Sequence, residues 1–188
     1  MQPSSVSTPE ISEAPRWYVL RDLKRANARE HAYQLFLEQQ MEVFTPMKWQ
    51  LATVKGKRIR KEVPYMPDLL FVHATRQHID PIVESQPTIQ YRWLRNKFRE
   101  PMTVPDAEMN RFIQAIRATE SPKYFLPEEV TPSMLGRPIR MIGGSLDGYE
   151  GTLLTVRGSK VKRLLVELPG LLTVGVEVDP EYIVFLND

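Results

Sequence analysis

The sequence predicts an α+β fold: a mixed sheet with flanking helices in the N-terminal two thirds, then a small β-barrel at the C-terminus. Two observations support this fold class. Up to about residue 120, runs of β-forming residues alternate with stretches whose apolar residues have helical spacing. After residue 132, short strand candidates follow one another with turns between them, as in a small closed barrel.

The first element of the fold is expected near Arg16. Residues 1–15 are rich in serine and proline and lack a periodic apolar pattern, which predicts a disordered leader. A domain is then expected over residues 16–120. Its strands are predicted at 16–20, from 43, at 69–72 and at 89–94, with a basic hairpin tip at 55–58. Its helices are predicted at 28–40, around 79–83 and from near Pro105.

The C-terminal part is expected to begin after a proline-rich stretch. Residues 121–132 contain three prolines and two glutamates, a composition that favours a flexible linker. The barrel would occupy residues 133–188, with Gly151 inside a strand, where a missing side chain marks a bulge or a close backbone approach. Its strands are expected at 137–142, 151–157, 163–168, 172–178 and 182–186.

Composition excludes several classes of protein. The chain has no cysteine, so disulfides and thiolate chemistry are excluded. It has no apolar run of membrane-spanning length and no signal-peptide pattern, which favours a cytoplasmic protein without membrane contact. Its three histidines do not form a metal-binding motif, and the phosphate-binding and nucleophile motifs of common enzymes are missing. We therefore expect a protein that binds rather than catalyses, without cofactor or metal.

The positive charge is concentrated in the N-terminal part. Residues 16–63 contain 11 lysines or arginines and 5 acidic residues, although the whole chain has a formal net charge of only +2. Such a basic block attracts the phosphates of nucleic acids by releasing counterions. A solvated helix face and a soluble hairpin tip explain the same charges, so both interpretations stay open at this point.

Four stretches, taken together, resemble the NusG family of bacterial transcription elongation factors. They are RWYVL at 16–20, VPYMPDLLFV at 63–72, PMTVPDAEM at 101–109, and the glycine-rich segment 136–151, which is similar to the KOW motif. The resemblance covers roughly residues 16–188. It implies an N-terminal NGN domain, an α/β sandwich that binds RNA polymerase, and a C-terminal SH3-like KOW barrel.

Within that family, the chain is more similar to the specialised paralogues, the RfaH-like and UpxY-like antiterminators. The grounds are Lys24 and Arg25 after the first strand and the compact hairpin tip at 54–58. The resemblance implies a monomer that binds the polymerase clamp helices, contacts non-template DNA, suppresses pausing or termination, and recruits a ribosomal protein or termination factor through KOW. The alternative is a ribosome-associated KOW-type RNA-binding protein.

The polymerase contacts implied by the resemblance lie around the central strand. Because side chains alternate along a strand, one face would carry Leu70 and Val72 and the other Leu69 and Phe71. We expect the second face to be an exposed apolar patch for a partner helix, although burial of both faces is the alternative. The implied polymerase-binding residues are Tyr65, Met66, Leu69, Phe71 and Arg21.

Further contacts are implied for nucleic acid and for the KOW partner. The nucleic-acid candidates are Lys24, Arg25, Arg29 and Arg92, although an ordinary charged helix start explains the first three equally well. In the barrel, Leu146 and Tyr149 flank the turn that faces partners in relatives. A tyrosine in a small barrel is as often part of the core as a contact.

Overall fold

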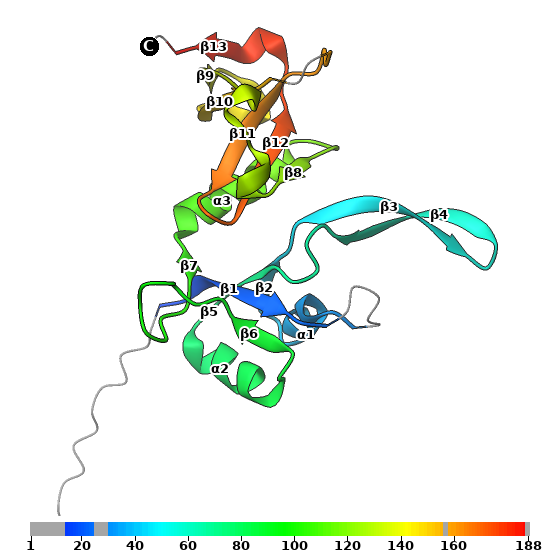
Figure 1. Cartoon of the computed structure of the whole chain (residues 1–188), viewed down its shortest axis with the longest axis vertical. Coiled ribbons are helices and arrows are strands. Elements are labelled where there is room, and N and C mark those ends of the chain that lie inside the picture. The colour runs from blue at the N-terminus through cyan, green and yellow to red at the C-terminus, as the bar shows by residue number, and fades with distance from the viewer. Residues whose placement is uncertain (1–13, 25–29, 156–157, 187–188) are drawn as a thin grey trace, which may run out of the picture. The chain divides into compact units, whose positions relative to one another are not determined.

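The computed structural model of the protein describes residues 14–24, 30–155 and 158–186 (Figure 1). The chain forms two compact units. One comprises Met1–Val43 and Asp68–Thr103, and the other comprises Phe44–Pro67 and Val104–Asp188. The expected disordered leader falls almost entirely outside the described residues. The division into domains at residues 120 and 132 stays a prediction.

The first unit is built on a sheet in the order β2-β5-β1-β6, with β7 pairing with β1. Strand β1 pairs antiparallel with both β5 and β6, so it lies in the interior of the sheet. The elements are β1 (Arg16–Asp22), α1 (Ala32–Glu38), β2 (Glu42–Phe44), β5 (Leu70–Ala74), α2 (Arg76–Ser85), β6 (Ile89–Tyr91) and β7 (Thr103–Val104).

Both helices of this unit pack on one face of the sheet. Tyr18 and Leu20 of β1 and Leu70 and Val72 of β5 form a core cluster with Phe36 of α1 and Ile79 of α2. The predicted alternation in the central strand is therefore confirmed for the face that carries Leu70 and Val72. Burial of these side chains is the main force that holds the helices on the sheet.

Helix α2 differs from the prediction in one respect. A short helix was expected around residues 79–83, but α2 already begins at Arg76, so Pro81 lies inside the helix. Because proline has no N–H, the helix loses one backbone hydrogen bond there. Burial of Ile79 in the core helps the helix to form despite that loss.

The second unit contains a two-stranded ribbon, β3 (Met47–Val54) with β4 (Lys57–Pro64), which Figure 1 shows as a long curved hairpin. Lys55 and Gly56 form its tip with positive φ angles of 49° and 77°. Two successive positive φ angles define the type I′ turn that matches the twist of a hairpin. The predicted basic tip is thus confirmed, and the turn fixes which residues face each other across the ribbon.

The rest of the second unit is a six-stranded sheet with one long helix. The strand order is β13-β9-β10-β11-β12-β8, and helix α3 packs against β11 and β12. The elements are α3 (Asp106–Arg117), β8 (Lys123–Phe125), β9 (Leu135–Met141), β10 (Glu150–Leu154), β11 (Arg163–Leu168), β12 (Leu172–Glu177) and β13 (Ile183–Phe185), with short 3₁₀ turns at Pro127–Glu129, Pro132–Met134, Gly144–Leu146 and Pro180–Tyr182.

All five predicted C-terminal strands are present, but a sixth was missed. Strand β8 lies inside the stretch expected to be a linker and pairs with β12 through Thr173 and Phe125. Tyr124 and Phe125 are buried, so two adjacent aromatic side chains outweigh the prolines on either side of them. Residues 123–125 are therefore part of the sheet.

Gly151 in β10 marks a close approach, as its position in a strand predicted. A Cβ atom at this position would lie 2.6 Å from the carbonyl oxygen of Leu165 and 2.8 Å from Cδ1 of Leu164. Both atoms belong to the neighbouring strand β11. Glycine is needed here because a side chain has no room.

Candidate functional site

Arg21 and Asp68 form an exposed ion pair on the surface of the first unit. The guanidinium of Arg21 lies 3.8 Å from the carboxylate of Asp68, and the two side chains are 48% and 51% exposed. An exposed pair of this length contributes little to stability. Both side chains are accessible to solvent, and the role of Arg21 in binding polymerase stays a prediction.

Leu69 and Phe71 do not form the exposed patch that was predicted. Leu69 is 2% exposed and Phe71 is 0% exposed, as are Trp17 at 2% and Val19 at 0% on the neighbouring strand. The sheet is therefore buried on both faces, which was the alternative interpretation. Alternation along a strand separates two faces but does not say whether both are covered.

Tyr65 and Met66 are half-buried. The Tyr65 ring packs on Tyr124 with centroids 5.0 Å apart, and its hydroxyl donates a hydrogen bond of 3.3 Å to the backbone oxygen of Tyr124. The Lys48 ammonium lies 5.3 Å from the Tyr65 ring. Burial raises the pKa of Tyr65, and the negative charge of Glu129 adds to this. Tyr124 and Lys48 thus cover part of the Tyr65 side chain, and only the rest of it is accessible to a partner.

Lys24 and Ala32 are both bonded to one buried carboxylate, that of Asp22. Asp22 is 3% exposed, and it accepts hydrogen bonds from the N–H groups of Lys24 at 2.9 Å and Ala32 at 2.7 Å. The Lys24 ammonium donates to the backbone oxygen of Glu30 at 3.1 Å. Arg25 and Arg29, two other predicted nucleic-acid contacts, lie outside the described residues.

Arg92 follows β6 and is half-buried, so only part of its side chain is available for the predicted contact. Its backbone N–H donates to the oxygen of Val19 at 2.9 Å, and its oxygen accepts from Met102 at 2.7 Å. Trp93 beside it is 45% exposed.

The ribbon of β3 and β4 carries exposed apolar and basic side chains together. Trp49 is 50% exposed and Leu51 is 71% exposed on one face of β3. Arg60 crosses from β4 and places its guanidinium carbon 4.5 Å from the centroid of the Trp49 ring. This diagonal cross-strand pair was not predicted, although the two-residue turn and the alternation of side chains specify it.

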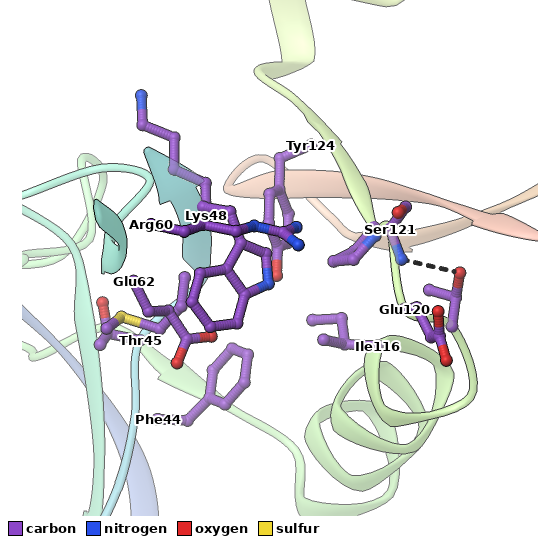
Figure 2. A pocket seen from close by; sticks show the side chains of 13 residues that line it. Phe44, Thr45, Lys48, Arg60, Glu62, Ile116, Glu120, Ser121 and Tyr124 are labelled. Atoms are coloured by element: carbon purple, nitrogen blue, oxygen red, sulfur yellow. Dashed lines mark hydrogen bonds between the residues drawn. The ribbon is translucent and has the colours of Figure 1, made fainter. Parts of the chain in front are cut away.

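A pocket of 510 Å³ opens at the base of this ribbon, and Figure 2 shows the side chains around it. Its apolar lining includes Phe44, Trp49, Ile116 and Tyr124, and its charged lining consists of Lys48, Arg60, Glu62 and Glu120. Burial raises the pKa of Tyr124 to about 12, with a smaller contribution from the nearby charge of Glu62. A pocket of this kind can accept an apolar or aromatic group that is flanked by charge.

Leu146 and Tyr149 lie in different surroundings. Leu146 is 4% exposed, so it packs inside the sheet unit and is not on the partner-facing surface that was predicted. Tyr149 is half-buried, and its hydroxyl donates to the backbone oxygen of Arg111 at 3.0 Å or to the side-chain oxygen of Gln114 at 3.2 Å. The Arg111 guanidinium lies 5.2 Å from the Tyr149 ring and also donates to the backbone oxygen of Glu150. Tyr149 therefore joins α3 to the sheet.

The described residues contain no group of three or more histidine, aspartate or glutamate side chains that could hold a metal ion. Similarly, none of the helices in the described part of the chain combines the length and apolar character needed to cross a membrane.

Comparison with known proteins identifies the family. The family model described as "Transcription termination factor nusG" matches residues 15–113, which is more than half of the chain. The chain belongs to the NusG family. A search of curated proteins gave no match. NusG family proteins are transcription elongation and termination factors that interact with RNA polymerase, and they are not enzymes.

Proposed function

We propose that this NusG family member is a transcription elongation and antitermination factor that binds bacterial RNA polymerase through an NGN domain at residues 16–120. The match to the family over residues 15–113 is the observation that carries this proposal, since it spans β1, the basic ribbon and the central strand β5. The factor would work by binding alone, in the cytoplasm, where bacterial polymerase acts.

The proposed contact with polymerase uses those of the implied polymerase-binding residues whose side chains are accessible. Arg21 and its partner Asp68 are each about half exposed, whereas Leu69 and Phe71 are covered. Contact through Leu69 and Phe71 would require their face of the sheet to be uncovered first. Arg21 is therefore the residue on which the first test should be made, with Tyr65 and Met66 next.

Binding of this kind suppresses pausing if the factor prefers the active conformation of polymerase. A ligand shifts an equilibrium only by its difference in affinity between the two states. A difference of about 1.4 kcal/mol changes a pausing equilibrium tenfold, so a small exposed surface is sufficient. The basic ribbon, with five lysines or arginines between Lys55 and Lys61, and the cation Lys24 would contact the non-template DNA or the upstream duplex.

The C-terminal sheet at residues 133–188 is proposed to be a KOW domain that recruits a second factor, a ribosomal protein or a termination factor. Tyr149 is the predicted contact that is partly accessible. Because its hydroxyl bonds to α3, a partner that takes this hydroxyl would have to compete with the helix. The further assignment to the specialised RfaH-like or UpxY-like paralogues rests on the basic residues after β1.

A charge exchange at Arg21 and Asp68 tests the polymerase contact. We would measure the affinity of the full chain for core RNA polymerase in the parent, in Arg21→Glu, and in the exchanged variant Arg21→Asp with Asp68→Arg. Arg21→Glu should weaken binding at least about fivefold. The exchanged variant should stay weak, because it keeps the internal pair but reverses the charges that a partner meets.

The matched control is the exposed pair of Arg140 and Glu150, whose side chains are 51% and 48% exposed. Exchanging these two charges should leave polymerase binding unchanged. Full recovery of affinity in the Arg21 and Asp68 exchange would show that only the internal pair matters. If the parent bound ribosomes or structured RNA but not polymerase, the ribosomal alternative would replace this proposal.

A further inference from the structure

A pocket of 300 Å³ in the first unit is lined by three arginines. Arg16 comes from the start of β1, Arg76 from the first turn of α2, and Arg99 from the loop between β6 and β7. Glu100 and Thr103 also line it. Guanidinium groups gathered in this way favour phosphate, to which each can donate two parallel hydrogen bonds.

The two acids near these arginines already have cationic partners. Asp80 accepts from Arg76 at 3.2 Å and 3.0 Å, and Glu100 lies 2.9 Å from the Lys97 ammonium. Among the described residues, Arg16 and Arg99 form no ion pair. The pocket thus has an excess of positive charge that is carried by Arg16 and Arg99.

Two exposed aromatic rings adjoin the pocket arginines. Phe98 is 90% exposed, and the guanidinium carbon of Arg99 lies 5.3 Å from its centroid. Trp93 is 45% exposed and lies 5.6 Å from Tyr91, whose ring is 5.5 Å from the Arg76 guanidinium. Phe98 and Trp93 thus offer exposed ring faces close to cationic side chains, on which a flat apolar group can stack.

The loop that carries these groups is closed at its base. Trp93 forms a bridge with Pro101, and the N–H of Leu94 donates to the oxygen of Glu100 at 3.0 Å. Arg99 has a positive φ of 49°, a conformation that costs a non-glycine residue energy. Residues 92–99 contain four cations, two aromatic residues and no acid. Interleaved basic and aromatic residues are typical of surfaces that bind unpaired nucleotides.

We propose that the loop at residues 93–100, together with Arg16 and Arg76, is a binding site for single-stranded nucleic acid. The phosphate of one nucleotide lies between Arg16 and Arg99, and an unstacked base lies on the ring of Phe98. An acidic peptide would satisfy the arginines but would leave Phe98 exposed. A duplex would offer phosphates but no free base face for stacking. Both contacts use groups that DNA and RNA share, so the site does not distinguish the two.

This site shares no residue with the contacts proposed above at Arg21 and on the ribbon. The test uses the full chain and labelled oligothymidylate and oligouridylate of about 12 nucleotides, which is within the site size of known single-strand binders. Fluorescence anisotropy at about 50 mM and about 200 mM salt gives the affinities and their salt dependence. No polymerase is present, so the outcome is independent of the proposed function.

Phe98→Ala should weaken binding to both oligonucleotides at least about fivefold, the lower range for loss of one stacked base. Arg99→Gln should weaken binding. It should also reduce the slope of the logarithm of the affinity against the logarithm of the salt concentration by about one, because one phosphate contact is lost. Both side chains are exposed, so neither change should unfold the protein. The matched control is Phe185→Ala, which removes another exposed phenylalanine next to an arginine, since the guanidinium carbon of Arg137 lies 4.4 Å from the centroid of its ring. This variant should bind both oligonucleotides as the parent does.

Several outcomes would overturn the proposal. One is that the parent binds neither oligonucleotide, and another is that Phe98→Ala and Arg99→Gln bind as the parent does. Equal affinity for a duplex of the same length would contradict stacking of an unpaired base on Phe98, because a duplex offers no free base face. A preference of more than about tenfold between the DNA and the RNA strand would contradict recognition through shared groups alone.

Discussion

The carboxylate of Asp22, at the end of β1, accepts a hydrogen bond of 2.7 Å from the backbone N–H of Ala32, the first residue of α1. Asp22 is almost completely buried, so the bond is shielded from water. The first N–H groups of a helix have no partner within the helix, and here a residue ten positions earlier supplies one. The relationship fixes where the helix begins, and the same carboxylate also accepts from the N–H of Lys24.

Asp22→Ala should lower the free energy of unfolding by about 2 kcal/mol, because two backbone N–H groups lose a charged acceptor. Asp22→Asn keeps one oxygen and should lose less. Urea denaturation followed by circular dichroism would measure both. A loss below about 0.5 kcal/mol for the alanine variant would show that water replaces the carboxylate without cost.

The buried Tyr124 predicts a loss of stability at high pH. Its pKa is raised to about 12 in the folded protein, chiefly by burial, whereas an unfolded tyrosine ionises near pH 10. Between these values the unfolded chain releases a proton that the folded protein keeps. Stability should therefore be complete below about pH 10 and fall as the pH rises to about 12, by about 2 to 3 kcal/mol.

Denaturation at a series of alkaline pH values would measure this loss. In Tyr124→Phe the contribution of this residue disappears, so the decline between about pH 10 and about pH 12 should be shallower than in the parent. Identical slopes in the two proteins would show that Tyr124 ionises normally or that other tyrosines dominate.

Gly151→Ala should destabilise the protein strongly. The new methyl group would lie 2.6 Å from the backbone oxygen of Leu165, which cannot move without shifting β11. We expect a loss of more than about 2 kcal/mol. Gly148→Ala is the matched control, because it meets no atom within 4 Å but has a positive φ of 77°. It should cost only about 1 kcal/mol.

Thermal unfolding of the two alanine variants gives a direct comparison. A larger effect at Gly148 than at Gly151 would mean that the sheet relaxes around the added methyl group, and that backbone conformation is the more important constraint.

Tyr149→Phe should loosen α3 from the sheet without unfolding either. The substitution removes the hydroxyl that donates to Arg111 or Gln114, at a cost of about 1 kcal/mol. Amide hydrogen exchange should become faster in the C-terminal half of α3, whereas the amides of β12 should stay protected. Unchanged exchange in α3 would show that the hydroxyl of Tyr149 does not help to hold the helix.

Most helices and strands could be predicted from the sequence, because the spacing of apolar residues and the residues that form turns are local properties. The ribbon tip at Lys55 and Gly56 and the close approach at Gly151 follow directly from residue type. Strand β8 could not be predicted, because it is three residues long and pairs with β12, about fifty residues later in the chain. Its stability comes from burial of Tyr124 and Phe125 in the sheet, which no local pattern reveals.

The candidate site was harder to predict than the fold. Arg21 is exposed as expected, but Leu69, Phe71 and Leu146 are buried, because exposure depends on which parts of the chain cover a surface. The Arg60 and Trp49 pair was predictable from the turn and was overlooked. The arginine pocket was not predictable, since Arg16, Arg76 and Arg99 come from three separate elements.

The ribbon of β3 and β4 also has a practical consequence. Because nearly every side chain from Lys48 to Glu62 is exposed, substitutions there cost the core almost nothing. The type I′ turn at Lys55 and Gly56 needs only two residues that accept a positive φ, so an inserted peptide can replace it. The tip is thus a suitable position for a fluorophore or crosslinker that reports what the ribbon touches in a transcribing complex.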